Sequence, residues 1–197
     1  SFDEFLRTRL FEPLGMNDTF FYIPADKANR LASLYTPNAV GDLDEVDGLL
    51  SECSREKTPF CLFACSNEPH SPWNKGDVSQ YDAAKVKLPP YYVDTPETRD
   101  AFVRYLAEIS YYDWQVGELL KLLDKHGLSG NTMVMVVSEQ GNALPFAKWT
   151  CYENGVQSAM VVRWPGKVKP GNTTSAMVEY VDVVLFSLKR LLVCSDV

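Results

Sequence analysis

The sequence predicts an α/β fold in which a mainly parallel sheet is flanked by helices and carries a small N-terminal appendage. One observation is a long amphipathic segment lying between two apolar runs, the order strand–helix–strand that implies a right-handed crossover and parallel strands. Another is a set of short apolar runs typical of strands, at residues 60–64, 132–137 and 158–163. Ligands of such sheets bind at the carboxyl ends of the strands, so we look there for a site.

The first run, residues 60–64, is continuously apolar and predicts a buried strand. A helix is expected to follow at residues 96–126, because Thr95 is a good N-cap, Pro96 suits the first helical position and Gly127 suits the end. Its expected core-facing stripe is Phe102, Leu106, Ile109, Val116, Leu120 and Leu123.

The run at residues 132–137 predicts a central strand covered on both faces, and residues 158–163 predict another strand that ends at the WPG turn. Residues 178–192 predict a helix. At the start of the chain, residues 1–37 form a separate block with a helix that ends at residues 13–15, an extended run at 20–23 and a short helix at 25–35. The acidic stretch 38–56 has no clear period and is interpreted as a linker or junction.

Composition excludes some classes of function. The chain has 197 residues and a formal net charge of -7, which argues against a nucleic-acid partner. No apolar run is long enough to span a bilayer, and we expect no signal segment at the start of the chain. The five cysteines include no CxxC pair, so neither a zinc site nor a disulfide framework is predicted.

Polar residues follow two of the predicted strands. His70 lies in the stiff loop NEPHSPW (residues 67–73), where it could donate to a sulfate or phosphate oxygen or protonate a leaving group. Glu139 and Gln140 offer a carboxylate and an amide, hard oxygen ligands that suit calcium or magnesium. Lys148 lies among apolar residues and could face an oxyanion. The alternatives are a structural histidine, a solvated turn and a surface lysine.

Five motifs in order give a resemblance to a known family. They are NEPHSPW (67–73), the helix at 105–123, NTMVMVVSEQG (131–141), VRWPGKV (162–168) and VDVV (181–184). Residues 57–184 therefore resemble the later part of a sulfatase catalytic domain, of the alkaline-phosphatase-like superfamily. The resemblance implies a partial sulfatase-like sheet, sulfuric ester hydrolysis, and a sulfated sugar or other sulfate ester as substrate. A secreted or periplasmic location would fit the family.

The resemblance also implies roles. Glu139 and Gln140 occupy the place of the family's Asp-Asn metal pair and would bind Ca²⁺, although each side chain is one methylene longer. Lys148 would contact the sulfate, and His70 the sulfate or the leaving-group oxygen. The family's nucleophile is a formylglycine made within a C/S-x-P-S-R motif, and this sequence has neither that motif nor the early Asp-Asp pair. We therefore expect weak calcium binding and no activity of this chain alone.

The N-terminal block resembles a different family. Residues 11–21, FEPLGMNDTFF, resemble a stretch of β-lactamase-like serine hydrolases, but no SxxK motif is present. The expected organisation is a hydrolase-like fragment at 1–37, a junction at 38–56, a partial sulfatase domain at 57–184 and a divergent tail at 185–197. Two alternative functions remain open here, namely a non-catalytic remnant or anion-binding module, and a serine hydrolase.

Overall fold

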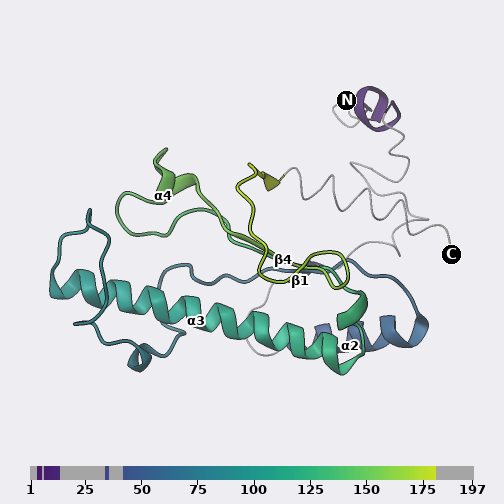
Figure 1. The fold of residues 1–197 in the computed structure, drawn as a ribbon, viewed down its shortest axis with the longest axis horizontal. Coiled ribbons are helices and arrows are strands. Elements are labelled where there is room, and N and C mark those ends of the chain that lie inside the picture. Colours follow the sequence, from purple (N-terminus) through teal and green to yellow (C-terminus); the bar gives the residue numbers. More distant parts are fainter. Residues whose placement is uncertain (1–3, 6, 14–33, 36–41, 181–197) are drawn as a thin grey trace.

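A computed structural model describes residues 4–5, 7–13, 34–35 and 42–180. In Figure 1 the long helix α3 runs beneath the strands, and α2 lies at its C-terminal end. In chain order the elements are η1 (Arg7–Phe11), β1 (Leu34–Tyr35), α2 (Asp42–Glu56), β2 (Phe63–Ala64), η3 (Val78–Gln80), α3 (Pro96–Lys125), η4 (Ser129–Asn131), β3 (Val134–Val137), α4 (Glu153–Val156) and β4 (Met160–Arg163). This mixture of helices with small sheets agrees with the α/β class predicted from the sequence.

Helix α3 begins and ends where the sequence predicts. The Thr95 hydroxyl accepts a hydrogen bond from the Thr98 amide at 3.2 Å, and Gly127 follows the helix with a φ of 68°. The predicted apolar stripe is only partly correct, because Ile109 is 37% exposed. The buried side chains of α3 are Leu123, which belongs to the predicted stripe, and Val103, Ala107 and Glu108, which do not. The loop after β2 packs on this face, so closely that a Cβ at Gly76 would lie 2.0 Å from the Ala107 carbonyl oxygen.

The acidic stretch that we interpreted as a linker or junction without a clear period is mostly helix α2, and its apolar residues do have a helical period. Val46, Leu50 and Cys53 recur at helical spacing and are buried. Together with Leu123 of α3, Val46 and Leu50 form the hydrophobic core cluster. The partly buried side chains that pack on this cluster are Phe60, Leu62, Leu119, Leu120, Leu122, Leu128 and Val134. The neighbouring acidic residues Asp44, Glu45 and Glu52 are exposed and mask the period in the sequence.

A polar clasp joins α2 to the end of α3 beside this core. Asp47 pairs with Nζ of Lys125 at 2.7 Å and with Nε2 of His126 at 2.6 Å. The hydrogen bond from Lys125, and then the one from His126, lower the pKa of Asp47. Ser54 Oγ also donates to the His126 carbonyl oxygen at 2.9 Å. Lys125 is a cation at the C-terminus of α3, where it interacts favourably with the helix dipole, and its pairing with Asp47 joins this end of α3 to α2.

The strands pair as two separate ladders in the described part of the chain. β1 and β2 are parallel, with Leu34 opposite Phe63, whereas β3 and β4 are antiparallel, with Val134 opposite Arg163. β3 therefore has one partner strand among the described residues, and our prediction of a central strand is wrong there. β2 is exposed rather than buried, with Phe63 55% exposed. An apolar run shows that a strand needs cover, but it does not show which residues supply the cover.

The N-terminal block differs from two of the predictions made for it. Leu34–Tyr35 is a strand that pairs with β2, so the helix expected at 25–35 does not extend this far and the block is not wholly separate from the rest. The π-helix η1 lies apart from the strands in Figure 1. The run expected at 20–23 and the tail at 185–197 lie outside the described residues, as does most of the helix expected at 178–192. No helix in the described ranges is long and apolar enough to cross a membrane.

Replacing Leu50 tests whether α2 is a core helix. Leu50 is 1% exposed and lies in the core cluster, so Leu50→Ala should lower the free energy of unfolding by about 2–5 kcal/mol. Urea unfolding followed by circular dichroism measures this change. The matched control is Glu45→Ala on the exposed face of the same helix, which should shift the value by about 0.5 kcal/mol or less. Equal effects of the two substitutions would mean that α2 does not pack as described.

Candidate functional site

The loop that follows β2 presents His70 on the surface with one ring nitrogen already committed. Nδ1 of His70 lies 2.6 Å from the Ser71 carbonyl oxygen. A carbonyl oxygen only accepts, so Nδ1 carries the proton in this contact. The other ring atom, Nε2, is then an acceptor in the neutral ring and a donor in the imidazolium. The His70 amide also donates to the Asn67 carbonyl oxygen at 3.0 Å, which closes a backbone turn over residues 67–70.

Helix α3 anchors this loop at several points. Ser66 Oγ donates to Oε1 of Gln115 at 2.7 Å. Oε1 of Glu108 accepts the amide hydrogens of Asn74 and Lys75, the latter at 2.6 Å. Inside the loop, the Trp73 indole donates to the Pro69 carbonyl oxygen at 3.0 Å. The loop is therefore held by specific polar contacts on both sides of His70.

The end of β3 lies near the same face of α3. The Tyr112 hydroxyl donates to the Val137 carbonyl oxygen at 3.5 Å, a long contact, and burial raises the pKa of Tyr112, with Tyr180 adding to the effect. Beyond the strand, Glu139 is exposed and Gln140 is half-buried. The Tyr180 hydroxyl donates to the Glu139 carbonyl oxygen at 3.4 Å, which leaves the Glu139 carboxylate available to solvent.

Lys148 lies in a tight turn with unusual backbone geometry. Phe146 has a φ of 65° and Trp149 a φ of 74°, both in the left-handed region that bulky residues rarely adopt. The Lys148 amide donates to the Asn142 carbonyl oxygen at 2.9 Å, and the Asn142 side chain accepts from the Leu144 amide at 2.9 Å. Such strain persists only where the surroundings enforce it, and it is frequent at functional sites. The half-buried Lys148 is thus held by an enforced turn.

Two glycines allow this turn to pack against α4. A Cβ at Gly141 would lie 1.7 Å from the Asn154 carbonyl oxygen. A Cβ at Gly155 would lie 2.4 Å from the Thr150 carbonyl oxygen. The space beside Gly141 is taken by the backbone of α4. Both glycines are therefore required by backbone packing.

A chain of aromatic rings connects the Lys148 turn to the His70 loop. The ring contacts run from Phe146 to Tyr91, Tyr92, Phe102, Tyr105 and Trp73, with centroid separations of 6.3, 4.8, 6.1, 6.1 and 5.6 Å. All five pairs are edge-to-face or tilted, arrangements that contribute about 0.5–1.5 kcal/mol each beyond buried area. The two loops are thus joined through one packed layer over the first half of α3.

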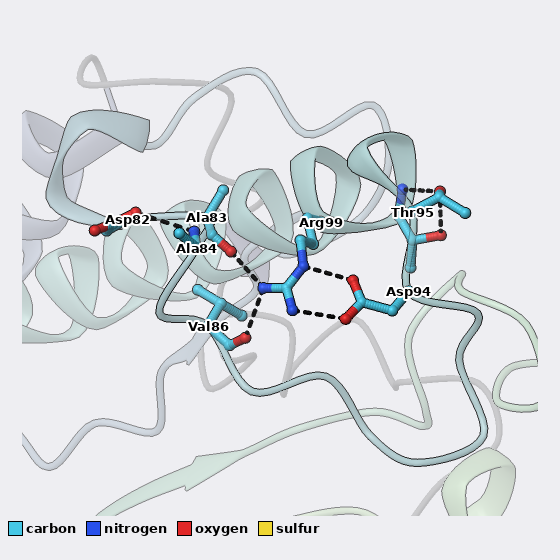
Figure 2. A network of polar contacts seen from close by, with 8 residues as sticks. Asp82, Ala83, Ala84, Val86, Asp94, Thr95 and Arg99 are labelled. Carbon is cyan, nitrogen blue, oxygen red and sulfur yellow. Dashed lines mark hydrogen bonds and ion pairs between the residues drawn. The ribbon is translucent and has the colours of Figure 1, made fainter.

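Arg99 holds the segment of residues 83–94, which carries the rings of Tyr91 and Tyr92. Figure 2 shows its guanidinium paired with both carboxylate oxygens of Asp94, with the nearer contact at 2.5 Å, and donating to the carbonyl oxygens of Ala83 and Val86. The Asp94 pKa is lowered, chiefly by the hydrogen bond from Arg99. A surface hollow beside Arg99 is lined in addition by Ala84, Thr95 and Pro96. Because the Arg99 charge is already paired, we do not assign this hollow to an anion.

The four side chains predicted from the sequence are placed on two loops that share one support. His70 lies on the first loop, and Glu139, Gln140 and Lys148 lie on the second. No hydrogen bond or ion pair joins these four side chains to one another in the described structure. One face of α3 contacts both the His70 loop and the end of β3, and it carries Tyr105, Glu108, Tyr112 and Gln115 at helical spacing.

Sequence reasoning missed these supporting residues. Glu108 lies 33 residues after Lys75, and Gln115 lies 49 residues after Ser66, so no local spacing reveals either contact. One signal was available in the sequence. Glu108 follows Ala107 on the buried side of α3. A carboxylate is rarely buried in a helix unless it is paired.

A calcium ion does not fit the described residues by themselves. No group of three or more histidine, cysteine, aspartate or glutamate side chains that could hold a metal occurs among residues 42–180 or the shorter described stretches. Glu139 and Gln140 offer one carboxylate and one amide, whereas calcium takes six to eight oxygen ligands. We therefore derive no chemical step through a metal.

Comparison with known proteins places the chain among sulfatases. The Sulfatase family model matches residues 14–189, most of the chain. The match begins inside the block at 1–37 that we interpreted as a hydrolase-like fragment, and the division of the chain near residues 38–56 stays a prediction.

Curated relatives and a solved structure agree with that match. An ulvan-active sulfatase of Formosa agariphila is 29% identical over 147 residues, which cover 73% of this chain and 28% of the relative. An N-acetylglucosamine-6-O-sulfatase of Bacteroides thetaiotaomicron is 35% identical over 82 residues, which cover 40% of this chain and 15% of the relative. The structure of yidJ, a Bacteroides fragilis protein assigned to the sulfatases, matches with a TM-score of 0.61 at 24% identity, over 74% of this chain and 35% of that one. The chain thus spans about a third or less of the length of these proteins.

The enforced turn around Lys148 gives a prediction on stability. Trp149 is 93% exposed, so replacing it removes few contacts and mainly changes the cost of its positive φ. Trp149→Asn should raise the free energy of unfolding by about 1 kcal/mol, because asparagine tolerates the left-handed region. The matched variant Trp149→Val should lower it, since a β-branched residue does not tolerate that region. Urea unfolding compares the two, and shifts of the same sign would contradict the described turn.

Proposed function

Because this chain belongs to the sulfatase family, we propose that its His70 loop and its Lys148 turn form part of a binding site for a sulfate ester. The observation that carries the proposal is the shared support of the two loops, which one face of α3 and one layer of aromatic rings hold together. The printed names of the relatives include an ulvan-active sulfatase and an amino-sugar sulfatase. We therefore propose a sulfated sugar as the substrate class.

Lys148 is proposed to bind the sulfate group. A lysine carries a positive charge and three donors on a flexible stem, which suits the oxygens of a monoanionic sulfate ester. Lys148 is half-buried and follows Ala147, which is 2% exposed. An ammonium in such a partly dry place interacts with an anion more strongly than one in bulk water.

His70 is proposed to contact the sulfate or the oxygen that leaves when the ester is cleaved. With Nδ1 engaged by the Ser71 carbonyl oxygen, Nε2 remains for the ligand. It can donate a hydrogen bond or a proton only as the imidazolium, so the charged ring is the form that we assign to binding. A leaving alkoxide oxygen needs such a donor, because it departs as a strong base otherwise.

The chain by itself is not proposed to complete the reaction. Cleavage of a sulfate ester in this family needs a nucleophile that attacks sulfur, and the sequence has no C/S-x-P-S-R motif to supply it. Glu139 and Gln140 are proposed as contributors to a metal site at the end of β3, and two oxygen ligands hold calcium weakly. The proposed activity of this chain is thus anion binding by part of a sulfatase site.

Lys148→Ala should weaken binding of 4-nitrophenyl sulfate on the order of tenfold, the loss expected for one charged hydrogen bond. His70→Ala should weaken it by a similar factor at a pH where the ring is charged. Isothermal titration calorimetry measures both. Lys169→Ala is the matched control, since Lys169 is exposed and lies outside the proposed site. Equal affinity of the wild type and both site variants for 4-nitrophenyl sulfate would contradict the proposal.

We expect no hydrolysis of 4-nitrophenyl sulfate by the purified chain, with or without millimolar calcium. Release of 4-nitrophenol followed by absorbance measures the reaction, and thermal unfolding measures calcium binding through the midpoint temperature. Calcium should leave this midpoint close to its value in magnesium, because two ligands bind it weakly. Calcium-dependent hydrolysis that Lys148→Ala abolishes would show that the chain contains an unrecognised nucleophile.

A further inference from the structure

We propose that Glu108 is the positioning residue of the His70 loop, and that it holds the loop on α3 through a proton carried by Glu68. The role of His70 in ligand binding rests on the function proposed above, whereas the attachment of the loop does not. The argument starts from Glu108, whose side chain is 0% exposed although it lies on a helix that is otherwise half-exposed.

The two oxygens of the Glu108 carboxyl group have different surroundings. Oε1 accepts the amide hydrogens of Asn74 and Lys75, so it binds the part of the loop that follows His70. Oε2 is buried and has no hydrogen-bond partner. A buried oxygen without a donor costs about 1–3 kcal/mol, so a donor nearby would have a large effect on the stability of this contact.

Glu68 can supply that donor. Its carboxyl group lies within hydrogen-bonding reach of Glu108, and its backbone is fixed by a bond from the Glu68 amide to Ser66 Oγ at 3.0 Å. When both groups are ionised, neither can donate and their charges repel. When Glu68 is protonated, its hydroxyl can donate to Oε2 of Glu108, and the helix then holds the loop on both sides of His70.

The charges around Glu68 agree with this arrangement. Burial, and then the charge of Glu108, raise the pKa of Glu68, while Lys75 and His70 act in the opposite direction. An acid whose pKa is raised by folding contributes full stability below its ordinary pKa and loses it as the pH rises through the raised value. The loop should therefore be attached most firmly in mild acid and open more often as the pH increases.

Hydrogen–deuterium exchange of the full chain tests the proposal without any substrate. Peptides that cover residues 66–76 are followed from about pH 4, below the ordinary pKa of a glutamate, to about pH 8, with rates corrected for intrinsic exchange. In the wild type, protection of these peptides should fall as the pH rises, while peptides of α2 keep theirs. Glu68→Gln should remove the pH dependence, because the amide donates to Oε2 at every pH. The control Glu52→Gln, on the exposed side of α2, should behave as the wild type does.

Glu108→Ala should lose protection at least tenfold at every pH, in the loop and not in α2. If this variant does not fold, Glu68→Gln and the wild type still decide the question. Loop protection that does not change with pH in the wild type, or that changes equally in Glu68→Gln, would overturn the proposal. Neither result depends on sulfate binding, so a failure here is separate from a failure of the proposed function.

Discussion

The burial of one side of α3 is the constraint on which the described part of the chain depends. A helix of 30 residues is about 45 Å long, and it cannot be covered by a single neighbour. Its C-terminal half is covered by α2 and the residues around β3, through the cluster of Val46, Leu50 and Leu123. Its N-terminal half is covered by two long loops and their aromatic side chains. The same helix is therefore core scaffold at one end and site scaffold at the other.

Local signals predicted those elements whose ends are set by local chemistry. Thr95, Pro96 and Gly127 marked α3 correctly, and the short β-branched runs marked β3 and β4, because caps and strand propensity act over a few residues. α2 was missed although Val46, Leu50 and Cys53 already had the right spacing, since the acidic residues around them resemble a solvated linker. The exposure of β2 and the single partner of β3 depend on what packs against them, and a strand's own sequence does not contain that information.

The residues of the candidate site also divide into those that the local sequence predicts and those that it does not. The sequence could predict candidates because they lie in loops after predicted strands and have side chains that can bind an anion or a metal. These candidates are His70, Glu139, Gln140 and Lys148. The support could not be predicted, since Ser66 with Gln115 and Lys75 with Glu108 are contacts between distant residues. Likewise, the left-handed backbone at Phe146 and Trp149 has no sequence signal in either residue type.

The close approach of Gly141 and Gly155 to neighbouring carbonyl oxygens has a consequence for how this region can diversify. Backbone touches backbone at both glycines, so the path of residues 141–155 cannot widen to admit a larger side chain at either one. Trp149, Phe146 and Tyr152 on the same stretch are 93%, 54% and 64% exposed. Of these three positions, Phe146 and Trp149 have a positive φ that restricts replacements, whereas Tyr152 has an ordinary φ of -73°. A library that randomises Tyr152 and retains both glycines would sample new surface chemistry on an unchanged frame.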